Sequence, residues 1–288
     1  MATDRWTTYR LLNKKRLSPN MWLYRFALPG KHSCLGWSAI ERHIRVRAIS
    51  LSTGQSIMRE YTPISNPMTQ NGSFDLAVKL YDTGEMSHIF AQLEIGTGLE
   101  MCGPFGDITL QENTTQNVVE ISSLSAAVSY GLPTHRPVTR MTMLAAGSGI
   151  TPMIQILNVM VSFTSTAQPI VDVFQANKTF NDILFRAHLE HVAKEWTNEF
   201  TIVHALSREQ SEGKDGKGTH TYGKDIRLGR IDVGCLEKVC SSRVDGSQRS
   251  GGDDGHFWLL CGSRDFEAEM KVTLVQGLNV SEQNIMTF

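Results

Sequence analysis

The residues best suited to chemistry in this chain stand at positions 59–65, which read Arg-Glu-Tyr-Thr-Pro-Ile-Ser. In an extended strand, Arg59, Tyr61 and Pro63 share one face, because successive side chains alternate between faces. A guanidinium offers a planar fork of donors that suits a phosphate, and a tyrosine ring offers a flat face for a planar heterocycle. The run therefore favours binding of a dinucleotide that carries a stacked ring, although an ordinary edge strand before a proline turn has the same pattern.

A glycine turn at residues 144–153, Leu-Ala-Ala-Gly-Ser-Gly-Ile-Thr-Pro-Met, is the second candidate site. An apolar stretch precedes Gly147 and Gly149, and helical spacing follows them. Glycines permit a tight turn and a close approach of a ligand to the backbone. The start of the helix then offers N–H groups and a partial positive charge to a pyrophosphate. The same turn can also serve only to pack a helix on a strand, so both interpretations stay open.

Bulk composition excludes several classes of protein. The 288 residues suffice for two ordinary domains, and the net charge of -1 provides no global field for nucleic acid. Five cysteines without a Cys-x-x-Cys pair predict neither a disulfide framework nor a zinc site, and they favour a reducing compartment. We expect no metal site, since the pair His188 and His191 lacks a third ligand.

The amino-terminal residues lack the apolar core of a signal sequence, which predicts a cytoplasmic, soluble protein. Residues 141–170 carry no charge, and a stretch of that length raises the question of a membrane span. Gly147, Gly149 and Pro152 interrupt it, so a buried strand, a turn and a helix explain it better. We therefore expect no transmembrane segment.

Two kinds of pattern divide the chain. The first part alternates polar and apolar residues between turn signals, which predicts strands at residues 22–28, 43–49 and 74–81 and a short helix at 84–93. The second part alternates apolar strands with helical spacing, which predicts a parallel sheet covered on both faces. Its strands are expected at residues 140–145, 170–174, 200–206 and 257–261, and its helices at 151–163, 182–196 and 267–277.

We therefore predict two domains, an antiparallel β-barrel at residues 1–112 and an α/β parallel-sheet domain at residues 138–288. Residues 113–137 are polar and poor in charge, which predicts a linker or insertion. Residues 209–223 and 241–255 are rich in Gly, Ser, Asp and Lys, which predicts surface loops.

Five short motifs in a fixed order resemble the ferredoxin–NADP reductase superfamily. They are Arg-x-Tyr-Thr-Pro-x-Ser from Arg59, Gly-x-Met-Ser from Gly84, Gly-Pro-x-Gly from Gly103, Gly-Ser-Gly-Ile-Thr-Pro-Met from Gly147 and Cys-Gly from Cys261. Within that superfamily the chain most resembles NADH–cytochrome b5 reductase. The turn at residues 145–149 and the ending Asn-Ile-Met-Thr-Phe look closer still to the reductase domain of the soluble cytochrome b5–reductase fusion proteins. The resemblance covers nearly the whole chain, and it implies a flavin-binding barrel followed by an α/β nucleotide-binding domain.

The resemblance implies FAD as the bound flavin. Arg59 is expected on its pyrophosphate, Tyr61 against the flavin and Thr62 near the reactive edge, where Thr62 has a catalytic role. The other positions implied for FAD are Ala77 and Lys79 on a strand beside the flavin, the helix start Gly84, Met86 and Ser87, Thr151 from the second domain, and the terminal aromatic Phe288 that covers the flavin.

The resemblance also implies a site for NADH. Gly147 and Gly149 form the nucleotide turn, and Cys261 with Gly262 lies beside the nicotinamide, where Cys261 has a catalytic role. Asp182 is expected to accept from the adenosine ribose, and a carboxylate there disfavours the 2′-phosphate of NADPH. Considered without the resemblance, Cys261 is a small buried residue and Asp182 an ordinary helix-start carboxylate.

The chain departs from the family pattern mainly in the nucleotide half. Alanines replace the first glycine of the turn, a serine replaces the proline after Cys-Gly, two charged residues follow that serine, and the expected Gly-Gln-His strand start differs. These positions are Ala145, Ala146, Ser263, Arg264, Asp265 and the run Glu41, Arg42 and His43. Lys178 and Arg186 near Asp182 weaken the preference for NADH and leave NADPH open.

The implied reaction is hydride transfer from the C4 atom of NADH to the N5 atom of FAD where the two domains meet, followed by release of single electrons to a haem protein such as cytochrome b5. The main contribution of the protein to this reaction is to hold the nicotinamide and flavin rings close together. Two alternatives stay open. An NADPH-preferring reductase for another acceptor would show in kcat/KM, and a non-catalytic partner-binding domain would lack a yellow flavin. We expect a monomer that reaches a membrane at most through its partner.

Overall fold

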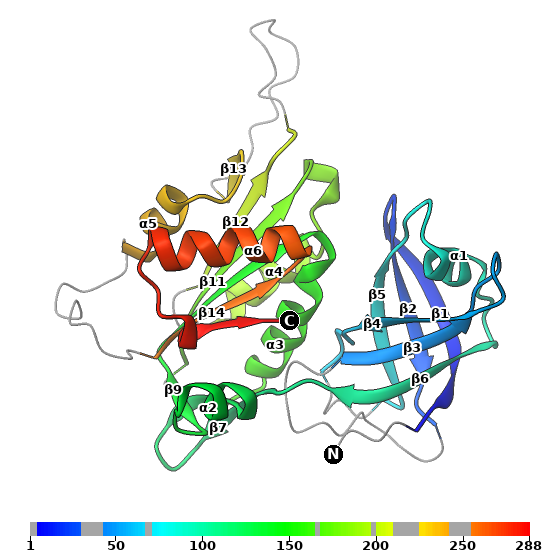
Figure 1. Cartoon of the computed structure of the whole chain (residues 1–288), viewed down its shortest axis with the longest axis horizontal. Coiled ribbons are helices and arrows are strands. Elements are labelled where there is room, and N and C mark those ends of the chain that lie inside the picture. The colour runs from blue at the N-terminus through cyan, green and yellow to red at the C-terminus, as the bar shows by residue number, and fades with distance from the viewer. Residues whose placement is uncertain are drawn as a thin grey trace, which may run out of the picture. The chain divides into compact units, whose positions relative to one another are not determined.

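The computed structural model describes residues 5–29, 43–66, 71–164, 168–196, 200–209, 225–241 and 255–288. Most of the two predicted surface loops, and Glu41 and Arg42 of the departing strand start, lie outside these residues. The chain divides into two compact units, and the first comprises residues 1–111, 122–128 and 151–163. The second unit comprises residues 112–121, 129–150 and 164–288 (Figure 1).

The first unit is built on an antiparallel sheet in the order β4-β3-β6-β1-β2-β5. Its strands are β1 (Thr7–Ser18), β2 (Met21–Ala27), β3 (His43–Ile49), β4 (Ser56–Tyr61), β5 (Ser73–Lys79) and β6 (Gly98–Phe105). The chain beyond β4 meets the opposite end strand, because Pro63 forms a β-bridge with Leu76. The Ile64 N–H donates to the Asp75 carbonyl over 2.9 Å at the same place. These links close the sheet on itself, and the antiparallel barrel expected from the sequence is confirmed.

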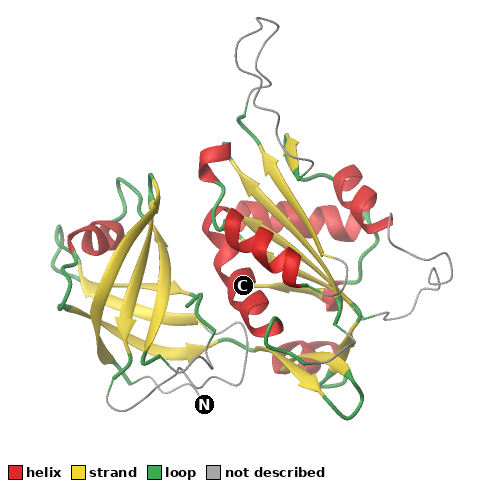
Figure 2. Cartoon of the chain, turned by 180° about the vertical axis from the view of Figure 1, so that it is seen from behind, coloured by secondary structure: helices red, strands yellow, loops and turns green. Residues whose placement is uncertain are grey.

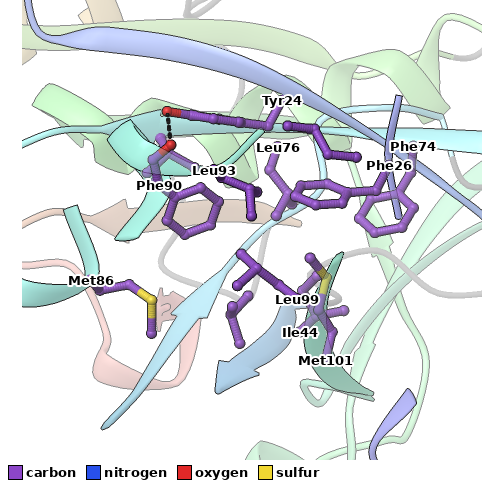
Figure 3. Close-up of a cluster of buried hydrophobic side chains, with 13 residues drawn as sticks. Tyr24, Phe26, Ile44, Phe74, Leu76, Met86, Phe90, Leu93, Leu99 and Met101 are labelled. Atoms are coloured by element: carbon purple, nitrogen blue, oxygen red, sulfur yellow. Dashed lines mark hydrogen bonds between the residues drawn. The ribbon is translucent and has the colours of Figure 1, made fainter. Parts of the chain in front are cut away.

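The core of the first unit comes from alternate positions of these strands. Phe74, Leu76 and Val78 are buried along β5, as the period of two predicts. Helix α1 (Glu85–Gln92) adds Phe90 to this core. The buried hydroxyl of Tyr24 donates to the Phe90 carbonyl over 3.0 Å, so the polar end of this ring has a partner (Figure 3).

The second unit contains a parallel sheet in the order β13-β12-β11-β10-β14-β15. Its strands are β10 (Arg140–Ala146), β11 (Ile170–Asn177), β12 (Phe200–Leu206), β13 (Ile226–Leu228), β14 (His256–Cys261) and β15 (Ile285–Thr287). The central strands β10, β11 and β14 are almost continuously buried, as parallel strands with two covered faces should be. The predicted parallel sheet is confirmed.

Helices cover both faces of this sheet (Figure 2). Helices α5 (Val233–Ser241) and α6 (Arg264–Val272) pack their apolar residues with Leu144, Phe174 and Leu260. Gln175 follows Phe174 on the strand and so points to the opposite face. Its amide donates to the Leu184 carbonyl over 3.3 Å, just before α4 (Arg186–Glu195). Helix α4 therefore lies on the opposite face from α5 and α6.

Some predicted boundaries are wrong. The helix expected at 182–196 begins at Arg186, because residues Phe180–Asp182 form a 3₁₀ turn and Phe185 is left-handed, with φ of 57°. The last helix begins at Arg264 rather than at 267, and residues Thr273–Gly277 continue it as a π-helical turn.

The residues predicted to be a linker contain regular structure. Strands β7 (Ile108–Asn113), β8 (Val118–Ser123) and β9 (Arg136–Val138) form a third sheet, and α2 (Leu124–Tyr130) lies between β8 and β9 in sequence. Asp107 accepts hydrogen bonds from the Leu124 and Ser125 N–H groups over 3.1 and 3.0 Å and so caps α2 from outside the helix. Among the described residues, no helix is long and apolar enough to cross a membrane.

Candidate active site

The first group of predicted site residues lies where β4 ends. Tyr61 packs edge-on against Phe90 with ring centroids 5.2 Å apart, and burial raises the pKa of its hydroxyl. Arg59 is exposed, and its Nη1 donates to the Met58 carbonyl over 2.7 Å. Glu60, which lies between them in sequence, forms an ion pair with Arg45, with 3.0 Å between the Glu60 Oε1 and the Arg45 Nε. In this run Tyr61 packs against the core of the first unit, whereas Arg59 and Glu60 are both exposed.

The segment after Thr62 is held by a helix distant in sequence. Helix α3 (Ile150–Met160) contributes Gln155, which is fully buried and donates to the Pro63 carbonyl over 2.8 Å. Asn158 of the same helix donates to the Ile64 carbonyl over 2.7 Å. Because residues four apart on a helix share a face, Thr151 lies one turn before Gln155 on the side that faces this segment. Helix α3, which begins beside Thr151, is thus hydrogen-bonded to the two residues that follow Thr62.

The start of α1 fits a pyrophosphate. A Cβ at Gly84 would lie 2.7 Å from the Ser87 Oγ, so a side chain at this position would displace the serine hydroxyl. The Ser87 Oγ accepts from the Tyr81 N–H over 3.0 Å and fixes the turn that leads into the helix. Among the described residues, no side chain caps the first turn of α1. Its backbone N–H groups and the partial positive charge of the helix end therefore suit the phosphates of a dinucleotide.

Three further positions expected at the flavin, Met86, Ala77 and Lys79, belong to the first unit. Met86 is 5% exposed and Ala77 is 7% exposed, and both belong to the buried residues of the first unit. Lys79 is half-buried at the end of β5, and its Nζ lies 5.7 Å from the centroid of the Tyr81 ring.

The glycine turn of the second unit lies against the end of β14. Gly147 has φ of 54°, which a residue with a side chain rarely adopts, and Gly147–Gly149 forms a 3₁₀ turn. A Cβ at Gly149 would collide with the Cys261 carbonyl and lie 2.9 Å from the Gly262 N. The neighbouring strands are in register, with Ala145 opposite Cys261. The two glycines predicted for the nucleotide turn and the two residues predicted beside the nicotinamide, Cys261 and Gly262, are therefore together at the carboxyl edge of the sheet.

Phe288 lies at this edge as well. Strand β15 runs parallel to β14, and the Phe288 N–H donates to the Leu260 carbonyl over 3.1 Å. Arg136 supports the segment before it, because its guanidinium donates to the Asn284 Oδ1 over 3.0 Å and to the Gln283 carbonyl over 2.8 Å. Because Leu260 pairs with Thr287, the predicted terminal aromatic and Cys261 each follow directly after this last pair of the two strands.

Two family models match this chain. An oxidoreductase FAD-binding domain matches residues 8–110, and an oxidoreductase NAD-binding domain matches residues 143–271. A protein named NADH-cytochrome b5 reductase 1 from Meyerozyma guilliermondii is 33% identical over 275 residues, which cover 96% of this chain and 80% of that protein. The chain belongs to the NADH–cytochrome b5 reductase family.

Further comparisons agree with this membership. NADH-cytochrome b5 reductase 1 from Cryptococcus neoformans is 29% identical over 271 residues, which cover 94% of this chain and 78% of that protein. The cytochrome b5 reductase domain of Ulva prolifera nitrate reductase has the same fold, with a TM-score of 0.76 and 24% identity over 99% of this chain and 97% of that one. This reductase is therefore an oxidoreductase with an FAD-binding and an NAD-binding domain.

Two departures of this reductase from its family pattern, Ala146 and Ser263, have local structural reasons. Ala146 ends β10, and a Cβ at Gly262 would lie 3.0 Å from the Ala146 Cβ, so the alanine packs against the glycine. Ser263 caps α6, because its Oγ accepts from the Phe266 N–H over 3.3 Å. The Gly262 N–H donates to the Glu267 Oε1 over 3.0 Å. Glu267 was not identified from the sequence. Its carboxylate oxygen accepts from Gly262 because Glu267 lies in the first turn of α6, the helix that Ser263 caps.

Asp182 has a structural role in the reductase. Its Oδ2 accepts from the Thr179 N–H over 3.0 Å and from the Thr179 Oγ1 over 2.9 Å, which forms a capping box. The Phe180 N–H donates to the Glu209 Oε2 over 2.7 Å, so a second carboxylate that sequence reasoning missed supports the same turn. Asn177, just before this turn, is 7% exposed, and neither polar atom of its amide has a hydrogen-bond partner among the described residues.

The histidine pair on α4 does not form a metal centre with other side chains among the described residues. His188 is not on a solvated face, since its Nε2 is buried and burial lowers its pKa, with a further lowering from His191. His191 itself is exposed.

Proposed function

We propose that this chain transfers a hydride from NADH to FAD and passes the electrons singly to a haem protein such as cytochrome b5. The observation that carries the proposal is the strip of backbone where Gly149 approaches Cys261 and Gly262 so closely that no side chain fits between them. A flat ring can approach such a strip, and the names of the relatives agree with this chemistry. Bound FAD supplies an acceptor for a hydride that can release its electrons one at a time.

The first unit supplies the groups for the flavin. Arg59 is available at the surface for charge-assisted hydrogen bonds to the pyrophosphate, together with the N–H groups that begin α1. Tyr61, fixed by Phe90, offers its ring to the flavin. Thr62 is proposed to place its hydroxyl at the reactive edge, and the backbone just after it is held by Gln155, which donates to the Pro63 carbonyl.

The second unit supplies the groups for the nicotinamide. Gly147 and Gly149 allow the nucleotide to approach the backbone, and Glu267 orients the Gly262 N–H by accepting its hydrogen bond. Cys261 stands at the end of β14 and is proposed as a small contact for the ring. Positions such as these contribute by proximity, which makes the rate sensitive to shifts of about 1 Å.

Anaerobic stopped-flow spectroscopy tests the proposal. Purified protein should be yellow, excess NADH should bleach it in a single turnover, and oxidised cytochrome b5 should then restore the colour in one-electron steps. Flavodoxin and ferricyanide serve as alternative acceptors. Colourless protein that takes up no FAD, or bound FAD that NADH does not bleach, would contradict the proposal.

A second candidate is a reductase that prefers NADPH, and the bonds of Asp182 favour it. One oxygen of this carboxylate is already used by Thr179, while Lys178 beside it is exposed and could meet a 2′-phosphate. The ratio of kcat/KM for NADH and NADPH decides between the two. If the protein prefers NADPH and Lys178→Ala abolishes that preference, then NADPH rather than NADH is the donor.

The oligomeric state of the protein and its location in the cell are a separate part of the proposal. We propose that the protein acts as a monomer in the cytoplasm and approaches a membrane only through its acceptor. Light scattering of the FAD-loaded protein, and its distribution between the membrane and supernatant fractions of cells, test this. A stable dimer, or a membrane fraction that persists without the acceptor, would contradict it.

A further inference from the structure

A single carboxylate ties the turn between β3 and β4 to the start of α1. The Ser50 Oγ donates to the Glu85 Oε1 over 2.7 Å, and the Ser52 hydroxyl donates to the same oxygen. Ser50 is 2% exposed, and its Oγ also accepts from the Thr53 N–H over 3.0 Å. The Ser50 N–H donates to the Gln55 carbonyl over 2.8 Å and closes the turn. We call these three residues, Ser50, Ser52 and Glu85, the serine–glutamate bridge. The turn therefore holds its two serine donors in place for the Glu85 carboxylate.

The bridge holds a negative charge beside Arg59. Hydrogen bonds from Ser52 and Ser50 lower the pKa of Glu85, and the charge of Arg59 lowers it further, so the carboxylate is ionised at neutral pH. Glu85 is also the first residue of α1, where a carboxylate is favoured by the helix dipole. An anion thus occupies the neighbourhood of both groups that are proposed to bind the pyrophosphate.

Strand β4 needs such a support. It is an end strand in the order of the sheet, where it pairs with β3, and its side chains are mostly exposed. The hairpin formed by β3 and β4 therefore has few buried apolar contacts that could fix its position against α1. The serine–glutamate bridge supplies a polar connection at the turn, and β4 runs from that turn directly to Arg59.

We propose that Glu85 is a positioning residue, which holds the β3–β4 hairpin on α1 so that Arg59 and the first N–H groups of the helix bind one and the same FAD pyrophosphate. The inference rests on the proposed role of Arg59 in FAD binding. It predicts that Glu85 acts on FAD affinity through Arg59, although its own charge has the same sign as the pyrophosphate.

A double-mutant cycle on the apoprotein tests this inference. The dissociation constant of FAD is measured by quenching of flavin fluorescence for Glu85→Ala, Arg59→Ala and the pair. Glu85→Ala alone should weaken FAD binding on the order of tenfold, as expected for loss of support to a charge-assisted hydrogen bond. In the Arg59→Ala background the same change should have almost no effect. Glu94→Ala, an exposed acid just beyond the other end of α1, is the matched control.

Two further variants separate the connection from the charge. Ser50→Ala with Ser52→Ala removes the donors and keeps the carboxylate, so it should weaken FAD binding as Glu85→Ala does. Glu85→Gln keeps an acceptor oxygen and should retain most of the affinity. Hydrogen exchange of residues 50–55 should become faster in the serine variant and in Glu85→Ala, and it should stay unchanged in Glu85→Gln.

The outcomes are distinct. Tighter FAD binding in Glu85→Ala would show that the carboxylate only repels the pyrophosphate, and it would overturn the inference. Equal weakening with and without Arg59 would also overturn it, while the assignment of Arg59 would stand. An unchanged FAD affinity in Arg59→Ala would contradict that assignment, and the inference would fall with it.

Discussion

Phe288 donates its backbone N–H to the carbonyl of Leu260 over 3.1 Å. This bond continues the parallel pairing in which Leu259 and Leu260 lie opposite Met286 and Thr287. Since Leu260 precedes Cys261, the aromatic residue predicted to cover the flavin and the cysteine predicted to contact the nicotinamide are fixed to one another through a strand. Backbone pairing of β15 with β14 therefore fixes where the main chain of Phe288 lies.

Replacement of the Phe288 ring should change catalysis without unfolding the sheet. Phe288→Ala keeps the bond to Leu260 and removes the ring, so the melting temperature should change little while the rate of flavin reduction by saturating NADH changes at least severalfold. Phe288→Tyr is the conservative control and should stay near the original rate. An unaltered rate and unaltered nucleotide affinity in Phe288→Ala would argue against a place for the ring at the flavin.

Arg59→Ala should weaken the binding of FAD. Loss of a hydrogen bond to a charged group costs about 1.5–3 kcal/mol, which corresponds to roughly tenfold or more in affinity. Equilibrium binding of FAD to apoprotein measures the effect. Arg10→Ala, on an exposed position of β1 in the same unit, is the matched control and should bind FAD normally. Equal FAD affinity in both variants would remove Arg59 from the site.

Gln155→Leu should destabilise the protein, because the buried Pro63 carbonyl loses its donor. An unsatisfied buried polar group costs about 1–3 kcal/mol, which should appear in the free energy of unfolding in urea. Thr62 precedes Pro63, so FAD retention and the rate of flavin reduction should fall as well. Gln92→Leu on the exposed side of α1 provides the comparison. Full stability in Gln155→Leu would mean that water or another donor replaces the amide.

Acid should destabilise the second unit through His204. This residue is fully buried on β12, and burial lowers its pKa from 6.5 to about 4. Asp225, whose Oδ2 lies 3.9 Å from the His204 Nε2, raises the pKa by less than burial lowers it. Of the two other charges nearby, Arg186 lowers the pKa and Glu190 raises it. Above pH 6.5 the imidazole is neutral in both the folded and the unfolded chain. As the pH falls from 6.5 towards 4, the unfolded chain takes up the proton first, and stability is lost by about 3 kcal/mol.

Urea denaturation between pH 7.5 and 5 measures this loss. His204→Gln cannot take up the proton, so its stability should depend less steeply on pH over that range. The exposed His191→Gln should leave the slope unchanged and serves as the control. An identical slope in His204→Gln would mean that other groups cause the acid sensitivity, with His256 the next to test, because burial lowers its pKa to about 3.

Local patterns predicted the central elements well. The ranges expected for β3 and β12 coincide with the observed strands, since alternation and apolar runs follow directly from burial of one or two faces. Strand β1 was not predicted, because its run of Asn, Lys and Arg residues leaves its side chains largely exposed and conceals the period of two. The start of α4 was misplaced because Asp182 serves a 3₁₀ turn that resembles the first turn of a helix.

Several predicted site residues lie at strand or helix ends, as Gly84 and Cys261 do, but their supporting partners could not be found from sequence. Gln155 meets Pro63 across 92 positions, and Arg136 meets Asn284 across 148. No local period connects such pairs, and each follows only once the sheets bring distant segments together. The glutamates Glu209 and Glu267 were missed for a different reason, since exposed-looking acids at helix and strand ends are common and have no distinctive spacing.

The bridge between Pro63 and Leu76 has a consequence for how copies of this protein behave towards each other. A sheet that ends in an open strand offers a row of unpaired donors and acceptors to any neighbouring chain. Here the continuation of β4 meets β5, and the proline contributes no N–H that a foreign strand could use. Loss of the Ile64 contact to Asp75 would reopen that row, so damage at this small junction should appear as self-association on storage.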